Sequence, residues 1–471
     1  MKQRRKQLPS NSRHTPAVSR HATSAKNSQR APGLSRRAFL ANSAAAAAAV
    51  ATTGFFSEVA AAPSDSPSET LHIGAIGVGN RGVDNIVAVA KEPGVEIAAL
   101  CDVDEKFLAD MVRRFPRASR HRDFRKMLDE PGLDAVIVST PDHTHAHAAS
   151  AALRRGLHVY CEKPLAHTFD EVRLLARLAG DMRLVTQMGN QWRSTDGYRR
   201  AVALVRAGTL GHVGEVHAWT DRPLWPQGID RPREDEQPEV PDHLDWDLWL
   251  GPAPHRPYSA AYHPLKWRGF WDFGGGALGD MGSHLLDPIY LALELAYPTS
   301  IEADTTDVND ETYPAASTVR FTFAARGELP PVALTWYDGA KIPPESVTGT
   351  SRPPANGSLL VGTRAKMFIP ERGGEPRVLP LARGDKIDVP KLDLPSAPGH
   401  HAEWALACKA GKATSSSFAD VAPMVQTCHL GNIAIRLGRK FEWNADKAAP
   451  IDCPAAEALL RRDYRNGWEL F

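Results

Sequence analysis

The segment GGGALGDMGSHLLD, residues 274–287, places an acid and an imidazole one helical turn apart. Asp280 and His284 are four residues apart, so in a helix they lie on the same face. Leu278 and Met281 fall roughly on the opposite face and are predicted to be buried. A histidine can act as a general base near neutral pH, and a nearby carboxylate can orient it or bind a substrate hydroxyl. The segment therefore predicts a catalytic pair on a helix.

Asp287 comes three residues after His284 and could extend this polar face. Pro288 follows it, and a proline kinks or interrupts a helix, so the face is expected to end before Asp287. Asp280, His284 and Asp287 could also be ligands of a metal ion. Because no further histidine or cysteine pattern supports such a site, no metal is predicted.

A lysine stands at the end of a predicted buried strand, in CEKPL over residues 161–165. Ligands of open parallel sheets bind beyond the carboxyl ends of the strands, so Lys163 is expected to point into a cleft. There it could polarise a substrate oxygen and stabilise a developing alkoxide. By composition alone, a surface salt bridge is the simpler interpretation of this lysine.

A glycine turn, Gly77-Val78-Gly79-Asn80-Arg81-Gly82, follows one predicted strand and precedes a predicted helix. Glycines in such a turn let the backbone approach a pyrophosphate at the positive end of the helix. Asp102 ends the next strand, at about the separation expected for a carboxylate that binds the ribose hydroxyls of a dinucleotide. This carboxylate would repel a 2′-phosphate and so favours NAD over NADP, although Arg81 could still contact a phosphate.

Short apolar strands alternate with helices between about residues 70 and 190, which predicts a parallel, doubly wound sheet. From about residue 214 the strands alternate apolar and polar residues, as in an antiparallel sheet with one covered face. We therefore predict an α/β protein with a nucleotide-binding domain over 71–190 and a substrate-binding, oligomerisation α/β domain over 191–471. The expected strands are 71–78, 95–104, 134–142, 158–164 and 183–190, then 214–222, 317–326, 331–339 and 357–370.

The glycine turn, STPDHTHA, EKPL and GDMGSH occur in the order seen in the Gfo/Idh/MocA family of oxidoreductases, which the chain resembles clearly over residues 71–290. The resemblance implies an N-terminal Rossmann domain, a C-terminal domain with a large open sheet and a nicotinamide cofactor. It also implies a reaction at a hydroxyl carbon of a sugar or cyclitol, often in a dimer or tetramer. The family pattern carries over to Lys163, Asp280 and His284 as catalytic residues.

Two further sets of residues are expected around these three. The segment DHTHAH resembles a metal-binding run, but its place after a strand indicates a cofactor-side loop and helix start. The predicted cofactor-binding residues are Gly77, Gly79, Asn80, Arg81, Gly82, Asp102, Thr140, Pro141, His143, His145, Glu162, Lys163 and Pro164. Aromatic side chains are dense over residues 245–273, where they could stack on a sugar ring or simply pack together. The predicted substrate-binding residues are Asn190, Gln191, Arg193, Tyr262, Trp267, Arg268, Asp280 and His284.

The net charge of +1 hides a strong asymmetry along the 471 residues. Residues 1–62 hold ten basic residues and one acid, whereas the remainder holds 46 basic and 54 acidic residues. The acidic body argues against nucleic acid as a partner.

Arg36 and Arg37 before an alanine-rich run indicate a twin-arginine signal over 1–62, a linker over 63–70 and export to the periplasm by the twin-arginine translocase. A disordered tail or a membrane anchor would also fit this segment. Five scattered cysteines indicate buried thiols.

Together these features predict an exported nicotinamide-dependent oxidoreductase of sugars, glycosides or cyclitols. Free NAD is scarce outside the cytoplasm, so a tightly held cofactor is expected. An NAD-dependent glycosidase, which uses transient oxidation and elimination, needs the same nucleotide domain and remains an alternative. A non-catalytic sugar or dinucleotide sensor on the same scaffold is a third reading, although the intact set of Lys163, Asp280 and His284 argues against it.

Overall fold

The computed structural model describes residues 70–229, 238–382 and 384–470. The predicted export signal and its linker lie outside these ranges. Within them, none of the helices combines the length and the apolar character needed to cross a membrane. All five cysteines are buried and free, as their spacing predicted.

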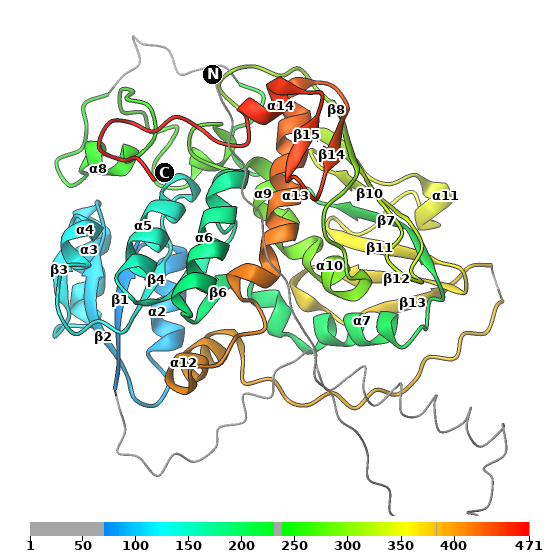
Figure 1. Cartoon of the computed structure of the whole chain (residues 1–471), viewed down its shortest axis with the longest axis horizontal. Helices are drawn as coiled ribbons and strands as arrows, with labels where there is room; N and C mark the ends of the chain where they lie inside the picture. Colours follow the sequence, from blue (N-terminus) through cyan, green and yellow to red (C-terminus); the bar gives the residue numbers. More distant parts are fainter. Residues whose placement is uncertain (1–69, 230–237, 383, 471) are drawn as a thin grey trace, which may run out of the picture. The chain divides into compact units, whose positions relative to one another are not determined.

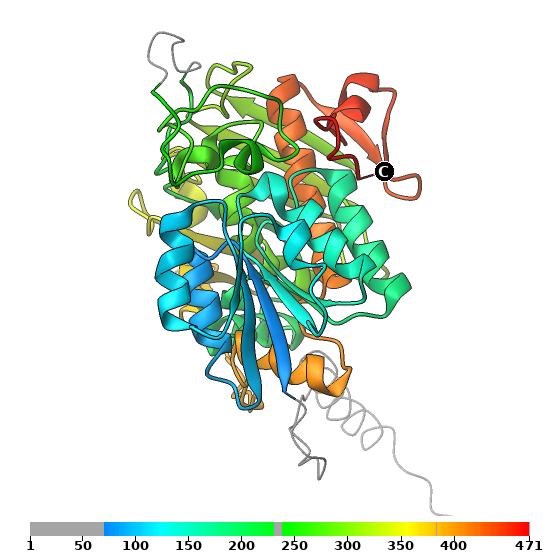
Figure 2. The same ribbon diagram turned by 90° about the vertical axis from the view of Figure 1, so that its left-hand side faces the viewer.

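The first half of the described chain builds a six-stranded parallel sheet (Figures 1 and 2). The strand order is β3-β2-β1-β4-β5-β6, so the order reverses between β1 and β4. In doubly wound sheets a ligand binds beyond the carboxyl ends of the strands at such a reversal. The strands are β1 (Leu71–Ile76), β2 (Val95–Cys101), β3 (Ser119–His121), β4 (Ala135–Val138), β5 (His158–Glu162) and β6 (Thr186–Gly189).

Helices cover both faces of this sheet, and each face has its own apolar core. On one face, side chains such as Val136 and Val159 pack against α5 and α6. On the other, Ile73 and Ile137 pack against α2, α3 and the late helix α12. The helices are α2 (Arg81–Val89), α3 (Glu105–Arg114), α4 (Phe124–Met127), α5 (Asp142–Arg154), α6 (Phe169–Met182) and α12 (His400–Ala410).

The edge strand β3 was not expected from the sequence. It has three residues, Ser119, Arg120 and His121, and each is partly or fully exposed. A short polar edge strand contributes no apolar run, so hydrophobic periodicity cannot detect it.

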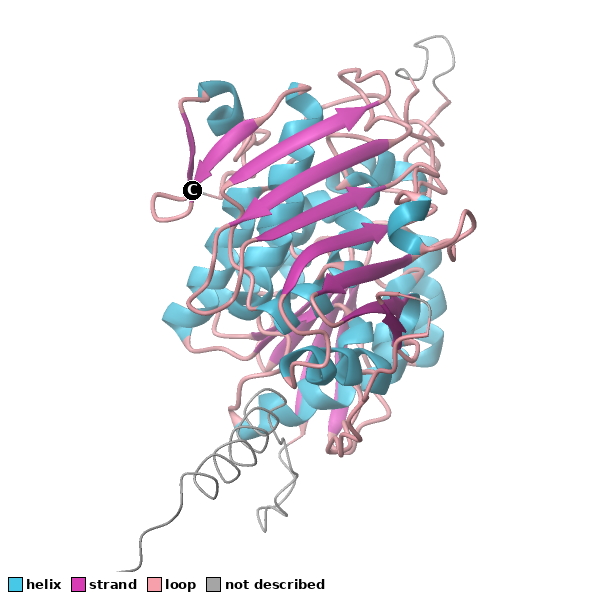
Figure 3. Ribbon diagram, turned by 90° about the vertical axis from the view of Figure 1, so that its right-hand side faces the viewer, coloured by secondary structure: helices cyan, strands magenta, loops and turns pink. Residues whose placement is uncertain are grey.

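The second sheet has nine strands in the order β13-β12-β11-β7-β10-β9-β8-β14-β15. The pairing of β10 with β7 is parallel and every other pairing is antiparallel, which confirms the mostly antiparallel sheet. Figure 3 shows this sheet with helices gathered behind it. Its strands are β7 (Val213–Trp219), β8 (Ser300–Thr305), β9 (Ser317–Phe323), β10 (Val332–Tyr337), β11 (Gly357–Gly362), β12 (Ala365–Pro370), β13 (Arg377–Pro380), β14 (Phe441–Asn444) and β15 (Ala449–Ile451).

The four strands expected here are present, but residues 357–370 form two strands rather than one. Thr363 and Arg364 join β11 to β12 as a hairpin, and their amides donate to the carbonyls of His212 and Leu210 instead of continuing a ladder. The strands β8, β13, β14 and β15 were also not foreseen. The remaining elements are α7 (Asp196–Arg206), α8 (Trp246–Leu250), α9 (Gly276–Leu285), α10 (Asp287–Leu293), α11 (Glu345–Thr348), α13 (Phe418–Leu437), α14 (Pro454–Ala458), η1 (Gln191–Ser194), η3 (Lys266–Gly269) and η4 (Glu371–Gly373).

The helix predicted from GGGALGDMGSHLLD is α9, and all ten of its residues are buried. It ends at Leu285, and a separate helix, α10, begins at Asp287 with Pro288 in its first turn. The expected interruption at Pro288 is therefore confirmed. The long helix α13 packs against α9, α6, β8 and β9 and so connects the two sheets.

We expect Trp404 in α12 to be essential for the packing of the first sheet. Its side chain is fully buried beside Tyr160, with ring centroids 5.6 Å apart. Replacing Trp404 by Ala leaves a large cavity and should lower the free energy of unfolding by about 3–5 kcal/mol. Met182→Ala at an exposed position of α6 is the control, and it should change stability by less than about 0.5 kcal/mol. Urea denaturation of the two variants measures the difference, and equal midpoints would contradict this assignment.

Candidate functional site

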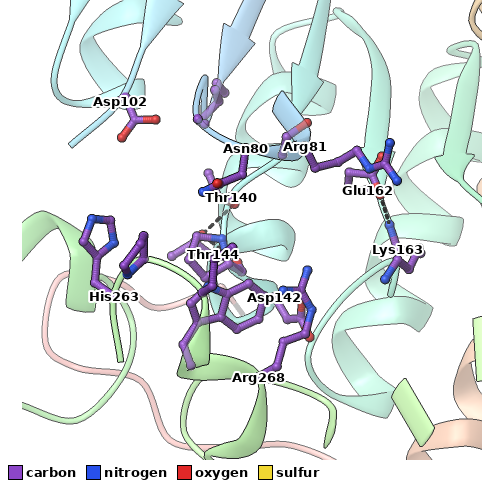
Figure 4. Close-up of a pocket in the computed structure, with 18 of the residues that line it drawn as sticks. Asn80, Arg81, Asp102, Thr140, Asp142, Thr144, Glu162, Lys163, His263 and Arg268 are labelled. Atoms are coloured by element: carbon purple, nitrogen blue, oxygen red, sulfur yellow. Dashed lines mark hydrogen bonds between the residues drawn. The ribbon is translucent and has the colours of Figure 1, made fainter. Parts of the chain in front are cut away.

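A cavity of about 490 Å³ lies beyond the carboxyl ends of the first sheet, where the strand order reverses. Its lining includes residues that follow β1, β2, β4 and β5, together with residues of η1, η3 and α9. Figure 4 shows these side chains converging from both parts of the chain. The cavity therefore joins the predicted nucleotide turn to the predicted catalytic helix.

The glycine turn forms part of the cavity wall, and its glycine positions have no room for side chains. Gly77 has φ +81°, and a Cβ there would lie 2.7 Å from the backbone of Ser139. A Cβ on Gly82 would lie 2.1 Å from the carbonyl oxygen of Gly77. The turn leads directly into α2, whose first amides point toward the turn. Such a tight cradle at a helix N-terminus fits a diphosphate group.

Asp102 lies at the end of β2 and lines the same cavity. Its carboxylate accepts hydrogen bonds from the backbone amides of Val78 (2.8 Å) and Asp104 (2.9 Å). Burial raises the pKa of Asp102 to about 6, against the lowering effect of these two hydrogen bonds. The carboxylate is thus held rigidly beside the glycine turn, and its remaining lone pairs can accept bonds from hydroxyl groups.

Lys163 and Asp280 form a buried ion pair across the cavity. Lys163 directly follows β5, and Asp280 lies in the second turn of α9. Arg268 from η3 makes a second ion pair with Asp280, with its Nε 3.2 Å from Oδ1. Burial alone would raise the pKa of Asp280, but the charges of Lys163 and Arg268 outweigh burial and hold this pKa well below its usual value. The predicted lysine and acid are therefore brought together, with an added arginine.

His284 lies one turn after Asp280 and stacks on Trp192, with ring centroids 4.2 Å apart and an interplanar angle of 21°. Burial, followed by the charge of Lys163, lowers the pKa of His284 well below 6.5. The imidazole is therefore neutral at physiological pH, and it is a weaker base than an imidazole in water. The hydrogen bond of Asp280 goes to Lys163, so in the described residues Asp280 fixes the lysine rather than the imidazole.

Asp142, the first residue of α5, is an unforeseen acid in the cavity wall. Its Oδ2 accepts a hydrogen bond from the amide of Gly275 (3.0 Å), while Oδ1 is buried without a hydrogen-bond partner among the described residues. Burial raises the pKa of Asp142 to about 7, against the lowering effect of Arg268 and Lys163. This carboxyl group therefore changes charge near neutral pH.

Several predicted residues line the cavity and others do not. Glu162 lines it, but its Oε1 also accepts hydrogen bonds from Asn85 (2.9 Å) and Gln191 (2.6 Å). The predicted residues that line the cavity are Gly77, Gly79, Asn80, Arg81, Asp102, Thr140, Pro141, Glu162, Lys163, Trp267, Arg268, Asp280 and His284. Those that are not in the lining are Gly82, His143, His145, Pro164, Asn190, Gln191, Arg193 and Tyr262.

The residues outside the lining are occupied by interactions within the protein. His143 contacts the Trp249 carbonyl (2.9 Å), and His145 lies between the carbonyls of Thr140 and Pro164, at 2.8 Å from each. Asn190 donates to Asp287 (2.7 Å). Arg193 has its Nε 3.8 Å from Asp287. Gln191 donates to Tyr160 and Glu162, and Tyr262 is buried in an aromatic cluster. Asp287 thus belongs to a separate buried polar group.

Sequence reasoning missed some of the lining. Trp192 lies inside the motif NQWR, between Gln191 and Arg193, which the sequence predicts to bind substrate through their polar groups. The aromatic ring between them is a signal of a stacking partner. Nothing in the sequence connects His263 or Arg372 to the cavity. The lining residues that were not foreseen include Asp142, Thr144, Trp192, Arg222, His263, Glu371 and Arg372. No cluster of metal-ligating side chains occurs in the part of the chain that the structure describes.

Family models match both parts of the chain. Residues 71–190 match the NAD-binding Rossmann fold of the Gfo/Idh/MocA oxidoreductase family. Residues 222–329 match the C-terminal α/β domain of the same family. The chain has the two domains of a Gfo/Idh/MocA oxidoreductase.

Several curated proteins are similar in sequence to part of this chain. Levoglucosan dehydrogenase of Pseudarthrobacter phenanthrenivorans is 27% identical over 228 residues, which cover 46% of the chain and 50% of the relative. Inositol 2-dehydrogenase 2 of Saccharopolyspora erythraea is 34% identical over 152 residues, 32% of the chain and 44% of the relative. A glycosyl hydrolase family 109 protein of Solibacter usitatus is 35% identical over 167 residues, 32% of the chain and 37% of the relative. The chain thus matches half or less of the length of these relatives.

The fold is also similar to that of solved dehydrogenase structures. The structure of levoglucosan dehydrogenase in complex with NADH and L-sorbose superposes with a TM-score of 0.58 at 18% identity, over 79% of this chain and 99% of that chain. At this identity, the likeness concerns the fold alone. It supports the arrangement of a Rossmann sheet beside a large, mostly antiparallel sheet.

We expect Asp142 to make the stability of this Gfo/Idh/MocA chain depend on pH. The carboxyl titrates near 3.8 when unfolded and near 7 when folded, so the folded state binds the proton more tightly. Stability from this group is present at low pH and is lost as pH rises toward 7. Asp142→Asn stays uncharged, so its free energy of unfolding at pH 8 should exceed that of wild type by about 4 kcal/mol, as a pKa difference of about three units implies. The two should be nearly equal at about pH 4.

Urea unfolding at both pH values measures this difference. Asp310→Asn, at an exposed loop position, is the control and should show the same small effect at both. A pH-independent effect of Asp142→Asn would contradict the raised pKa.

Proposed function

We propose that this protein is an NAD-dependent oxidoreductase that transfers hydride to or from a hydroxyl carbon of a sugar, glycoside or cyclitol. The observation that carries the proposal is the single cavity, with the glycine turn and Asp102 in one part of its wall and Lys163, Asp280 and His284 in another. A dinucleotide bound along the turn would bring its reactive ring toward these three side chains.

The part of the cavity wall formed by the glycine turn and Asp102 fits a nicotinamide dinucleotide. The Gly77–Gly82 cradle and the α2 N-terminus suit its diphosphate, and Asp102 suits the ribose hydroxyls. When bound, the nicotinamide ring accepts or supplies the hydride. Because Asp102 would repel a 2′-phosphate, we propose NAD rather than NADP.

The part of the cavity wall formed by Lys163, Asp280 and His284 fits the accompanying proton transfer. Oxidation of a carbinol requires loss of the hydroxyl proton, and neutral His284 can accept it. Lys163 can stabilise the oxygen as its negative charge develops. Asp280 holds the lysine in place and is itself paired with Arg268, so the ammonium group of Lys163 is pre-oriented before substrate binds. Reduction uses the same groups in reverse.

The cavity wall beside these three residues suits a sugar-like ring. Trp192 and Trp267 line the cavity near His284 and Arg268. Aromatic faces stack on the CH faces of a sugar while charged and polar groups bind its hydroxyls. The matches to levoglucosan and inositol dehydrogenases support this substrate class.

We also propose that the protein is exported with its cofactor bound and works as a homo-oligomer. The paired arginines of residues 36 and 37 and the alanine-rich run after them support passage through the twin-arginine translocase into the periplasm. This pathway suits a protein that folds around its cofactor first. A periplasmic enzyme has little free NAD(H), so the cofactor must stay bound and be regenerated within the cycle or by a second substrate.

A second candidate function is an NAD-dependent glycosidase. The match to a glycosyl hydrolase family 109 protein favours it, and Asp142 offers a further acid near neutral pH beside Lys163. Transient oxidation would acidify a neighbouring C–H, and elimination would then release the aglycone. Water would add to the double bond left in the sugar, and the hydride would return to the oxidised carbon. Aglycone release without net change in NADH separates this reaction from simple oxidation.

We expect Lys163→Ala and His284→Ala to lower kcat about 10²–10⁴-fold on whichever sugar or glycoside the wild type turns over. NADH binding, followed by fluorescence, should change less than kcat in either variant, because the Gly77–Gly82 cradle and Asp102 stay intact. Lys266→Ala, at an exposed position of η3, is the matched control and should keep full turnover. Unchanged kcat in Lys163→Ala and His284→Ala would contradict the assigned roles, and unchanged biological output with lost turnover would favour a sensor.

We expect the purified protein to contain NAD in near-stoichiometric amount. Denaturing the protein and identifying the released nucleotide by mass spectrometry tests both the cofactor and its retention. Adding candidate sugars before denaturation should convert the bound NAD to NADH. Protein that carries no nucleotide and works only with a large excess of added NAD would contradict retention.

A further inference from the structure

Part of the cavity wall comes from residues 243–265, which we call the cover segment. It contains α8 and contributes Leu248, Trp249, His263, Pro264 and Leu265 to the lining. In Figure 4, His263 lies on the same side of the cavity as Asp102 and away from Lys163. The cover segment therefore faces the part of the cavity suited to the adenosine half of a dinucleotide.

Both ends of the cover segment are attached to one buried carboxylate, Asp104. Near the start, His243 Nδ1 lies 3.0 Å from Asp104 Oδ1, and near the end, His263 Nε2 lies 2.9 Å from Oδ2. The exposed fraction of Asp104 is only 3%. Each imidazole can donate one N–H to the carboxylate in its neutral form. One side chain thus closes the segment into a loop.

Asp104 also belongs to the nucleotide-binding part of the fold. Its side chain caps α3 by accepting the amide of Lys106 (2.9 Å), and its own amide donates to Asp102 (2.9 Å). The carboxylate that suits the ribose and the carboxylate that holds the cover segment therefore belong to residues two apart, and the backbone amide of Asp104 bonds to the carboxylate of Asp102. A displacement of one would be transmitted to the other.

The main chain strengthens this attachment. Residue Leu244 forms an antiparallel bridge with Asp104, in which the Glu105 amide donates to the His243 carbonyl (2.8 Å) and the Asp245 amide to the Val103 carbonyl (2.9 Å). Within the segment, Trp246 stacks on Trp249 with ring centroids 4.6 Å apart. The segment is thus a packed wall joined to the nucleotide domain by backbone and side-chain bonds.

We propose that His263 is a further cofactor-contacting residue, and that Asp104 and His243 are positioning residues that hold the cover segment over the adenosine half of the bound dinucleotide. This inference rests on the proposed function and deepens it, because it assigns cofactor retention to named residues of the C-terminal part. A wall fixed before binding slows release of the nucleotide without contacting the reacting groups.

Three variants of the full chain test this arrangement. His243→Ala removes one bond to Asp104 without touching the cavity lining, and His243→Asn restores an N–H donor at a similar place. His72→Ala is the matched control, since His72 pairs with Asp134 at 3.2 Å at the opposite, amino end of β1. Stopped-flow measurement of NADH release should give a rate roughly tenfold higher for His243→Ala, the factor for losing one hydrogen bond to a charged group. His243→Asn and His72→Ala should release NADH at nearly the wild-type rate.

The effect should be confined to the adenosine half. Reduced nicotinamide mononucleotide, which lacks adenosine, should bind wild type and His243→Ala equally. Hydrogen–deuterium exchange of the nucleotide-stripped proteins should show faster exchange in His243→Ala over residues 103–107 and 243–265, and no change elsewhere. This second readout needs no cofactor.

The outcomes are distinct. An unchanged NADH release rate in His243→Ala overturns the retention role, whether or not exchange increases. Equal weakening of NADH and the mononucleotide overturns the adenosine assignment. Wild-type protein that binds no NADH overturns the proposed function and with it the cofactor role, while the exchange pattern still decides whether Asp104 holds the segment.

Discussion

The buried ion pair between Lys163 and Asp280 is the interaction on which the candidate site depends. It joins the end of β5, in the nucleotide-binding sheet, to α9, which belongs to the second half of the chain. Removing two charges from water costs several kcal/mol per ion, and only close pairing offsets that cost. Arg268 is a second cation paired with Asp280, and it helps Lys163 to hold the pKa of this carboxyl well below its usual value. If either half of the chain shifted, one of these charges would be left buried and unpaired.

The rest of the fold can be understood as the support for this pair. Helix α9 is buried along its whole length and is held from behind by α13, which also contacts α6 beside the first sheet. The glycines before α9 are fixed by hydrogen bonds from Asn432 to Gly275 (2.9 Å) and from Tyr313 to Gly274 (2.9 Å). The turn into the helix is thus bonded both to α13 and to the loop between β8 and β9. Such multiple restraints are what a pre-oriented charged group requires.

The aromatic residues before α9 form a packed cluster, and some of them also line the cavity. Trp246 and Tyr262 are buried in a cluster with Phe270 and Phe273, whereas Trp249 and Trp267 also reach the cavity. The sequence allowed two interpretations, stacking on a sugar and packing in a core. Packing occurs for Trp246 and Tyr262, and Trp249 and Trp267 also line the cavity. Whether an aromatic residue packs in the core or lines the cavity depends on its position in an irregular loop. The sequence does not predict this position, because loop conformation has no periodic signal.

Local patterns determined much of this protein. Apolar runs with helices between them are enough to predict the doubly wound sheet, and the glycine turn with Asp102 is enough to place a nucleotide site at its carboxyl edge. The spacing of Asp280 and His284, the break at Pro288 and the lysine after β5 could likewise be read along the chain, because each depends on backbone geometry within a few residues. Only the tertiary structure decided that Asp280 bonds to Lys163, that Trp192 and Asp142 join the cavity, and that Asn190 and Arg193 turn instead toward Asp287. Asp280 and Lys163 lie 117 residues apart, and Asn190 and Asp287 lie 97 apart. The choice of such partners depends on packing between elements, which no local spacing encodes.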